Sequence, residues 1–249
     1  MPNGPTLVAV AHGSRDPRSA ATVAALLAQV RAARPGTPTR LAFLDLNAPS
    51  VGQVLDSIAT AGETQAVVVP LLLGSAFHAR ADLPALLASA TARHPGLELT
   101  QAPVLGADPR LLELLHARVH AECTARDWDT EPERLGIALA AVGSSSTAAN
   151  RTTAGLAGEF AARTGIRTEI CFATAEPTLA RAAARLRARG ADRLLLAPWF
   201  LAPGRLTDRL RDQAPLLPHA GVLGPDQTLA EIVWDRYDNA RARALPLSA

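Results

Sequence analysis

The chain has 249 residues, of which 48% are hydrophobic and 19% are charged. Its 25 basic residues, all of them arginine, nearly balance 23 acidic residues and leave a formal net charge of +2. This balance argues against a dedicated nucleic-acid-binding protein, which would carry a basic stripe. Cys123 and Cys171 are too few for a disulfide framework, so we expect a reducing, cytoplasmic location. We expect neither a signal peptide nor a membrane span, because no apolar run reaches about 18 residues.

Short apolar runs alternate with longer amphipathic segments along the first half of the chain. The periodicity predicts strands at 6–11, 40–44, 66–73 and 97–101, and helices at 19–34, 50–61, 82–93 and 108–124. Ser50 is expected to cap the second of these helices. Nearly continuous apolar strands that alternate with helices predict a parallel sheet covered on both faces.

The same order of elements returns in the second half. The pattern predicts strands at 135–141, 168–172, 193–199 and 221–223, and helices at 149–163, 178–189, 205–214 and 226–243. The segment AHGS at 11–14 corresponds to AVGS at 141–144, and VPLLL at 69–73 corresponds to APWFL at 197–201. This internal duplication predicts two tandem, similar α/β domains at 1–126 and 134–249. The charged, proline-containing segment 127–133 is the predicted linker between them.

Each domain is expected to hold a four-stranded, mostly parallel sheet in the flavodoxin-like order 2-1-3-4. Ligands bind at the carboxyl ends of strands where the strand order reverses, here between strands one and three. His12 follows the first strand, His78 follows the third, and Asp45 follows the second. We therefore expect these side chains to lie at one crevice, where two imidazoles and a carboxylate suit a divalent metal and leave coordination positions open.

The duplication provides an internal control for the two histidines. Val142 stands in the second half where His12 stands in the first, and His78 falls near Leu206. A single histidine after a strand more often caps a turn than binds a metal. Two histidines at a switch point, both missing from the repeat, favour a function in the first domain over a role in packing.

Other motifs are less specific. Glu113, His116 and His120 have a spacing that can bind a metal, but their place on the helix favours a solvated face. The chain has neither a GxGxxG nor a GxxxxGK[ST] loop, so we expect no nucleotide cofactor. It also lacks the GxSxG elbow of many serine hydrolases. Each nearby arginine is either a surface residue or part of a carboxylate clamp; the candidates are Arg15, Arg18, Arg80, Arg205 and Arg209.

The segments HGSR at 12–15, FLDLNAPSV at 43–51 and VPLLLGSAFHARADLP at 69–84 resemble the class II chelatases. These are the cobaltochelatases of the CbiX type and the sirohydrochlorin ferrochelatases, and the duplication resembles their long, two-domain form. The resemblance implies insertion of a divalent metal into sirohydrochlorin without ATP. It assigns metal handling to His12 and His78, with His12 also as proton acceptor. It implies that the loop before His78 lines the tetrapyrrole; that loop consists of Leu73, Gly74, Ser75, Ala76 and Phe77.

This sequence departs from the family pattern at two places. The family often has glutamate before the proline of the second-strand loop, where this chain has Ala48, although Asp45 is kept. The second half has Glu176 before Pro177. The loop also reads Ser75-Ala76 where some members have His-Gly, so one further histidine is missing.

The expected chemistry fits the residues, because metallation removes two pyrrole protons and a neutral imidazole accepts a proton near neutral pH. Fe²⁺ for sirohaem is the first expectation and Co²⁺ for cobalamin the second, while ligand type does not separate these from Ni²⁺. The alternatives are a metal hydrolase or oxygenase with two histidines and one carboxylate, and a non-catalytic protein that binds the metal or the tetrapyrrole. We expect no nucleic-acid partner and either a monomer or a homodimer.

Overall fold

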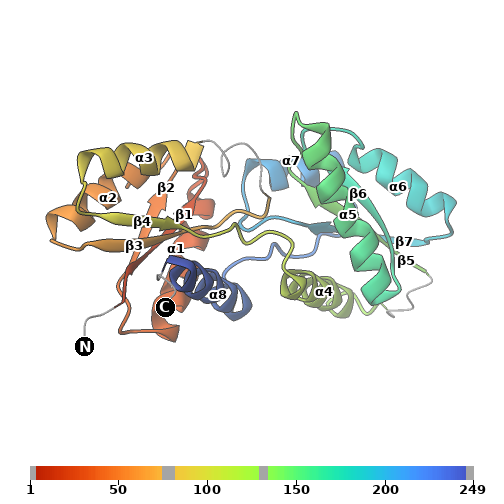
Figure 1. The fold of residues 1–249 in the computed structure, drawn as a ribbon. Coiled ribbons are helices and arrows are strands. Elements are labelled where there is room, and N and C mark those ends of the chain that lie inside the picture. Colours follow the sequence, from red (N-terminus) through yellow and green to blue (C-terminus); the bar gives the residue numbers. More distant parts are fainter. Residues whose placement is uncertain (1–3, 75–81, 129–133, 245–249) are drawn as a thin grey trace. The chain divides into compact units, whose positions relative to one another are not determined.

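The computed structural model describes residues 4–74, 82–128 and 134–244 (Figure 1). They form two compact units. The first unit combines Met1–Gly106 with the C-terminal segment Pro225–Ala249, and the second is Ala107–Gly224. No helix among the described residues is both long enough and apolar enough to cross a bilayer.

The first unit contains a parallel four-stranded sheet in the order β2-β1-β3-β4. This is the order predicted from the sequence. The elements of this unit are β1 (Thr6–Ala11), α1 (Pro17–Ala33), β2 (Thr39–Phe43), α2 (Val51–Thr60), β3 (Gln65–Pro70), α3 (Leu83–Arg93), β4 (Glu98–Gln101) and α8 (Gln227–Ala244).

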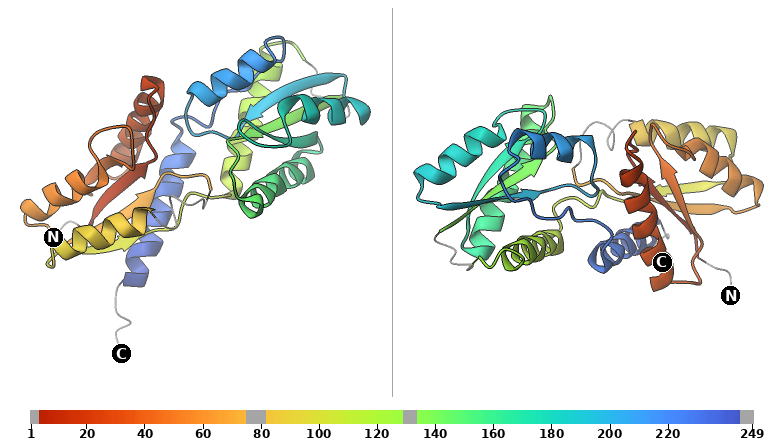
Figure 2. Two further views of the ribbon diagram at one scale, coloured as in Figure 1. Left: turned by 90° about the horizontal axis from the view of Figure 1, so that it is seen from above. Right: turned by 180° about the vertical axis from the view of Figure 1, so that it is seen from behind.

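Helices cover both faces of this sheet (Figures 1 and 2). α2 and α3 lie on one face, where Leu55 and Leu83 pack with Val8 and Val68 in a buried cluster. α1 and α8 lie on the other face. The indole Nε1 of Trp234 on α8 donates a hydrogen bond to the carbonyl oxygen of Val30 on α1 at 3.0 Å.

The second unit contains a parallel three-stranded sheet in the order β6-β5-β7. α6 and α7 contribute Leu186 and Leu210 to a buried cluster on one face of it, which also contains Cys171 of β6. The elements of this unit are α4 (Pro109–Thr124), β5 (Leu135–Ala141), α5 (Thr147–Thr164), β6 (Arg167–Phe172), α6 (Leu179–Ala188), β7 (Arg193–Pro198) and α7 (Arg205–Gln213).

The prediction of a fourth strand at 221–223 was wrong. A single bridge pairs Leu196 with His219, and its two hydrogen bonds run from Leu196 N to Pro218 O at 2.9 Å and from Ala220 N to Leu196 O at 2.8 Å. Proline has no N–H group to donate to a ladder, so Pro198, two residues after Leu196 on β7, cannot continue the pairing toward 221–223.

The compact units also differ from the predicted domains 1–126 and 134–249. The last helix of each repeat belongs to the unit of the other repeat: α4 lies in the second unit and α8 in the first. The chain therefore crosses between units after Gly106 and after Gly224. Of the predicted linker 127–133, the structure describes Asp127 and Trp128, which lie within the second unit, where Trp128 N donates to Cys123 O at 3.0 Å.

Candidate functional site

The carboxyl ends of β1, β2 and β3 meet in the first unit, as the strand order requires. Asp45 N, just after β2, donates a hydrogen bond to His12 O, just after β1, at 3.0 Å. Leu71 N, just after β3, donates to Val10 O at 2.8 Å. The structure therefore brings the predicted residues His12 and Asp45 together at the edge of the sheet where ligands bind in such folds.

Gly13 makes this close approach of the two loops possible. Its φ of +97° lies in the region that residues with a side chain rarely adopt. The Cβ position of residue 13 is occupied by the backbone of Asp45, at 1.8 Å from that carbonyl oxygen. The turn after β1 consequently has room for glycine alone at this position.

His12 and Asp45 are both exposed. The Nδ1 atom of His12 lies 3.3 Å from Gly13 O. Since a carbonyl oxygen only accepts, the Nδ1–H of the imidazole is the donor in this contact. The Oδ1 atom of Asp45 accepts from Leu46 N at 2.7 Å. The adjoining loops after β1 and β2 thus present an imidazole and a carboxylate at the same edge of the sheet.

Two further residues of the β2 loop were not singled out from the sequence. Leu46 has a φ of +62°, which is strained for a leucine, and its side chain is 47% exposed. Asn47 Oδ1 accepts a hydrogen bond from Ser14 N at 2.7 Å. The β2 loop thus holds an apolar side chain open to solvent next to Asp45.

Several predicted site residues fall outside the described part of the chain. Leu73 is half-buried and Gly74 is exposed, and both follow β3 as expected. Among the described residues, no group of three or more histidine, cysteine or acidic side chains is arranged to hold a metal ion. The predicted residues outside the described ranges are Ser75, Ala76, Phe77, His78 and Arg80.

The predicted arginines differ in their surroundings. Arg15 is exposed on the turn that carries His12. Arg18 is engaged by the N-cap residue of its own helix, because its Nη2 lies 2.6 Å from Asp16 Oδ2. Arg205 and Arg209 are exposed on α7 and belong to the second unit.

The second unit repeats the backbone of this site without its chemistry. Thr174 N donates to Val142 O at 3.0 Å, as Asp45 N does to His12 O. Gly143 has a φ of +89°, close to that of Gly13. The turn therefore forms with valine and threonine in place of histidine and aspartate, so packing of the strand ends does not require the imidazole or the carboxylate.

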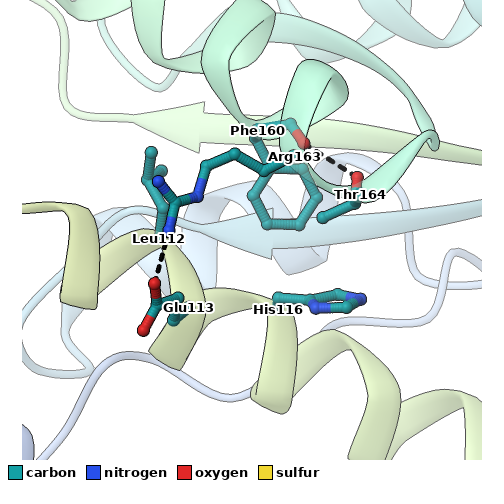
Figure 3. Close-up of a pocket in the computed structure, with 6 residues that line it drawn as sticks. All are labelled: Leu112, Glu113, His116, Phe160, Arg163 and Thr164. Atoms are coloured by element: carbon teal, nitrogen blue, oxygen red, sulfur yellow. Dashed lines mark hydrogen bonds and ion pairs between the residues drawn. The ribbon is translucent and has the colours of Figure 1, made fainter.

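The weaker candidates Glu113, His116 and His120 are exposed, as predicted. His116 packs its ring edge-on against Phe160, and Glu113 forms an ion pair with Arg163 (Figure 3). A pocket of about 310 Å³ between α4 and α5 is lined by Leu112, Glu113, His116, Phe160, Arg163 and Thr164.

Comparisons with known proteins agree with the repeat and the fold. The chain is 25% identical to the sirohydrochlorin ferrochelatase of Bacillus subtilis over 210 residues, which cover 84% of this chain and 78% of that protein. It is 25% identical to the sirohydrochlorin cobaltochelatase of Priestia megaterium over 173 residues, which cover 68% of this chain and 56% of that protein.

A solved structure described as SirB from Bacillus subtilis with Fe³⁺ has the same fold. It matches with a TM-score of 0.78 and 21% identity, over 96% of each chain. The family model of CbiX matches residues 6–122 and again residues 136–240. Because these two matches span most of both repeats, the chain belongs to the CbiX family.

Proposed function

We propose that this protein is a sirohydrochlorin chelatase that inserts a divalent metal, first of all Fe²⁺, into the tetrapyrrole without ATP. The observation that carries the proposal is the pairing of His12 with Asp45 at the carboxyl edge of the first sheet, in a member of the CbiX family. Fe²⁺ is placed before Co²⁺ because the relatives that match over 84% and 82% of this chain are ferrochelatases. Co²⁺ remains the second metal, because a cobaltochelatase matches over 68%.

The reaction exchanges two pyrrole protons for one divalent metal ion. In the proposed mechanism the Nε2 lone pair of His12 accepts a pyrrole proton, and His12 and His78 hold the incoming metal loosely enough to release it. Asp45 provides negative charge beside His12, which stabilises both an arriving cation and a protonated imidazole.

The proposed binding surface combines apolar and cationic groups. Leu46 and the segment from Leu73 to Phe77 contact the macrocycle in this proposal. Arg15 and Arg80 bind the carboxylates of sirohydrochlorin, for which the guanidinium fork is suited.

The test is the absorption change of sirohydrochlorin with Fe²⁺ under anaerobic conditions, and separately with Co²⁺. We expect the protein to accelerate metal insertion over the spontaneous rate. Replacing His12 with valine should lower this acceleration by about 100-fold or more, the range for loss of an acid–base group. Valine is the informative replacement because Val142 occupies the same position on the same turn of the second unit.

Further variants locate the site. Asp45→Thr introduces the residue that the equivalent loop of the second unit has at Thr174, so the loop should still form. Loss of the carboxylate should slow metal insertion. His78→Ala should behave as His12→Val does, whereas His116→Ala and His120→Ala should retain the wild-type rate. Spontaneous rates with wild-type protein would reject the proposed function, and a loss confined to His116→Ala would place the site at the pocket between α4 and α5.

A further inference from the structure

The turns after β1 and β5 share most of their hydrogen bonds. Ser14 Oγ accepts from Asp16 N at 3.1 Å, and Ser144 Oγ accepts from Ser146 N at 3.1 Å. Asp16 and Ser146 are the N-cap residues of α1 and α5. The two turns are therefore built alike up to the start of the following helix.

They differ in the group that accepts from the backbone N–H of the serine. In the second unit, Asn150 on α5 accepts from Ser144 N through Oδ1 at 2.8 Å and donates from Nδ2 to Ser144 O at 2.8 Å. The turn is thus held by its own helix. The corresponding position on α1, fourth in the helix like Asn150, is Ala20, which has no polar side chain.

In the first unit the acceptor for the serine N–H comes from the loop after the neighbouring strand β2. Asn47 Oδ1, in the loop after β2, accepts from Ser14 N at 2.7 Å. Two residues earlier in that loop, Asp45 N donates to His12 O at 3.0 Å. The segment from His12 to Ser14 is therefore attached at both its ends to the segment from Asp45 to Asn47.

The exchange of acceptors follows the exchange of chemistry between the units. Both turns are tied once to the loop after the neighbouring strand, since Thr174 N donates to Val142 O as Asp45 N does to His12 O. The second tie, at the serine N–H, comes from that loop only in the turn that carries His12; in the turn that carries Val142 it comes from the turn's own helix. Either arrangement satisfies the backbone N–H of the serine equally well. The need for a hydrogen-bond acceptor therefore does not explain why the two turns use acceptors from different segments.

We propose that Asn47 is a positioning residue, which holds the His12 turn against the Asp45 loop so that the imidazole and the carboxylate keep a fixed separation. The consequence for metal insertion depends on the proposed function. The consequence for the two loops does not, and it is measured separately.

Three variants and one control separate positioning from simple stability. Asn47→Ala removes the acceptor. Asn47→Asp keeps an oxygen that accepts from Ser14 N. The double variant Ala20→Asn with Asn47→Ala gives the first turn the acceptor that Asn150 provides in the second. It satisfies Ser14 N from the helix without restoring the second link between the loops. Asn150→Ala is the matched control, because it removes the equivalent hydrogen bond from the turn that carries Val142 in place of His12.

Two measurements are made on each variant. The first is kcat and KM for Co²⁺ insertion into sirohydrochlorin. Asn47→Ala should lower kcat by about 10- to 100-fold, as loss of a supporting contact to a metal-site residue commonly does, with KM changed by less than about threefold. Asn47→Asp should recover most of the rate, Asn150→Ala should keep it, and the double variant should remain slow although its stability to urea is restored.

The second measurement is amide hydrogen exchange of Asp45, which does not depend on the reaction. Exchange should be faster in Asn47→Ala and in the double variant, and unchanged in Asn150→Ala, because opening of the Asp45–His12 bond accompanies loss of the second tie. If wild-type protein inserts no metal but exchange changes in this way, the proposed function fails and the positioning role stands. Recovery of both rate and protection in the double variant would overturn the positioning role.

Discussion

Gly13 and Asp45 lie so close together that a Cβ atom on the glycine would stand 1.8 Å from the Asp45 carbonyl oxygen. This contact joins the turn after β1 to the loop after β2, and it fixes where His12 and Asp45 lie.

Gly13→Ala is expected to be strongly destabilising. The φ of +97° is unfavourable for alanine by about 1–2 kcal/mol, and the overlap with Asp45 adds about 1–3 kcal/mol of repacking. Urea unfolding should show a loss of more than about 2 kcal/mol. Gly36→Ala is the control, since nothing lies within 4 Å of its Cβ position. Equal stability of the two variants would show that the loops separate at little cost.

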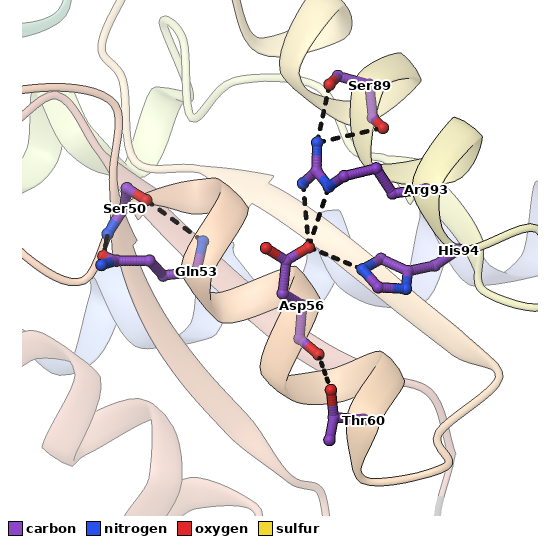
Figure 4. Close-up of polar contacts among 7 residues, drawn as sticks. All are labelled: Ser50, Gln53, Asp56, Thr60, Ser89, Arg93 and His94. Atoms are coloured by element: carbon purple, nitrogen blue, oxygen red, sulfur yellow. Dashed lines mark hydrogen bonds and ion pairs between the residues drawn. The ribbon is translucent and has the colours of Figure 1, made fainter.

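Asp56 should make the first unit sensitive to acid. The Asp56 carboxylate accepts from His94 Nε2 at 2.7 Å and from Arg93 Nη2 at 3.0 Å (Figure 4). The hydrogen bond from His94, followed by that from Arg93, lowers the pKa of Asp56 below its ordinary value of 3.8. A carboxylate with a lowered native pKa stabilises the fold above the unfolded-state pKa, and this contribution is lost as the pH falls through the native pKa.

Asp56→Asn should therefore flatten the dependence of unfolding free energy on pH below about pH 4. The measurement is urea unfolding at a series of pH values. Because the side chain is 47% exposed, the effect should also shrink at high salt. Asp212→Asn, which changes an exposed carboxylate on α7, should leave the acid limb as steep as in the wild type.

The two cysteines should be unreactive in the native state. Burial raises the pKa of Cys171 to about 12 and raises the pKa of Cys123 as well. Since the thiolate is the reactive form, only about one Cys171 side chain in 10⁴ is reactive at pH 8. A disulfide reagent should label no thiol in native protein and two per chain in urea. Rapid labelling of native protein would mean that the core around β6 opens readily.

Ionisation of Tyr237 should lower the stability of the protein at alkaline pH. It is the one tyrosine in the chain, and its Oη donates to Pro5 O at 2.6 Å from within α8. Burial, as the largest effect, raises the pKa of this phenol above 10.0. A raised native pKa means that the stabilisation is complete below the unfolded-state pKa and is lost as the pH rises through the native value.

Tyr237→Phe should lower the free energy of unfolding by about 1 kcal/mol near neutral pH, and should remove the decline above about pH 10. Ultraviolet titration of the single phenol should show ionisation in native protein at higher pH than in urea. Identical titration curves in the two states would contradict the burial of Tyr237 within the first unit.

The sequence by itself determined the local elements and the repeat. Apolar periodicity located β1 and β5 with the bounds that the structure has, and the Ser50 cap of α2 is present with its reciprocal bond to Gln53. These features depend on residues close together in the chain. The sequence also predicted that His12 and Asp45 lie at the same edge of the sheet, because parallel strands in the order 2-1-3-4 bring their carboxyl ends together there.

Only the tertiary structure decided which sheet each amphipathic helix covers. The apolar face of α4 or α8 requires burial, but its periodicity does not specify the partner, and the two repeats offer similar sheets. The same limit applies to Asn47: an asparagine in a loop can accept from many backbone N–H groups, and only the fold places it beside Ser14. The residue pattern within a segment determines whether it forms a helix or a strand. Packing between segments distant in the chain determines which partner that helix or strand contacts.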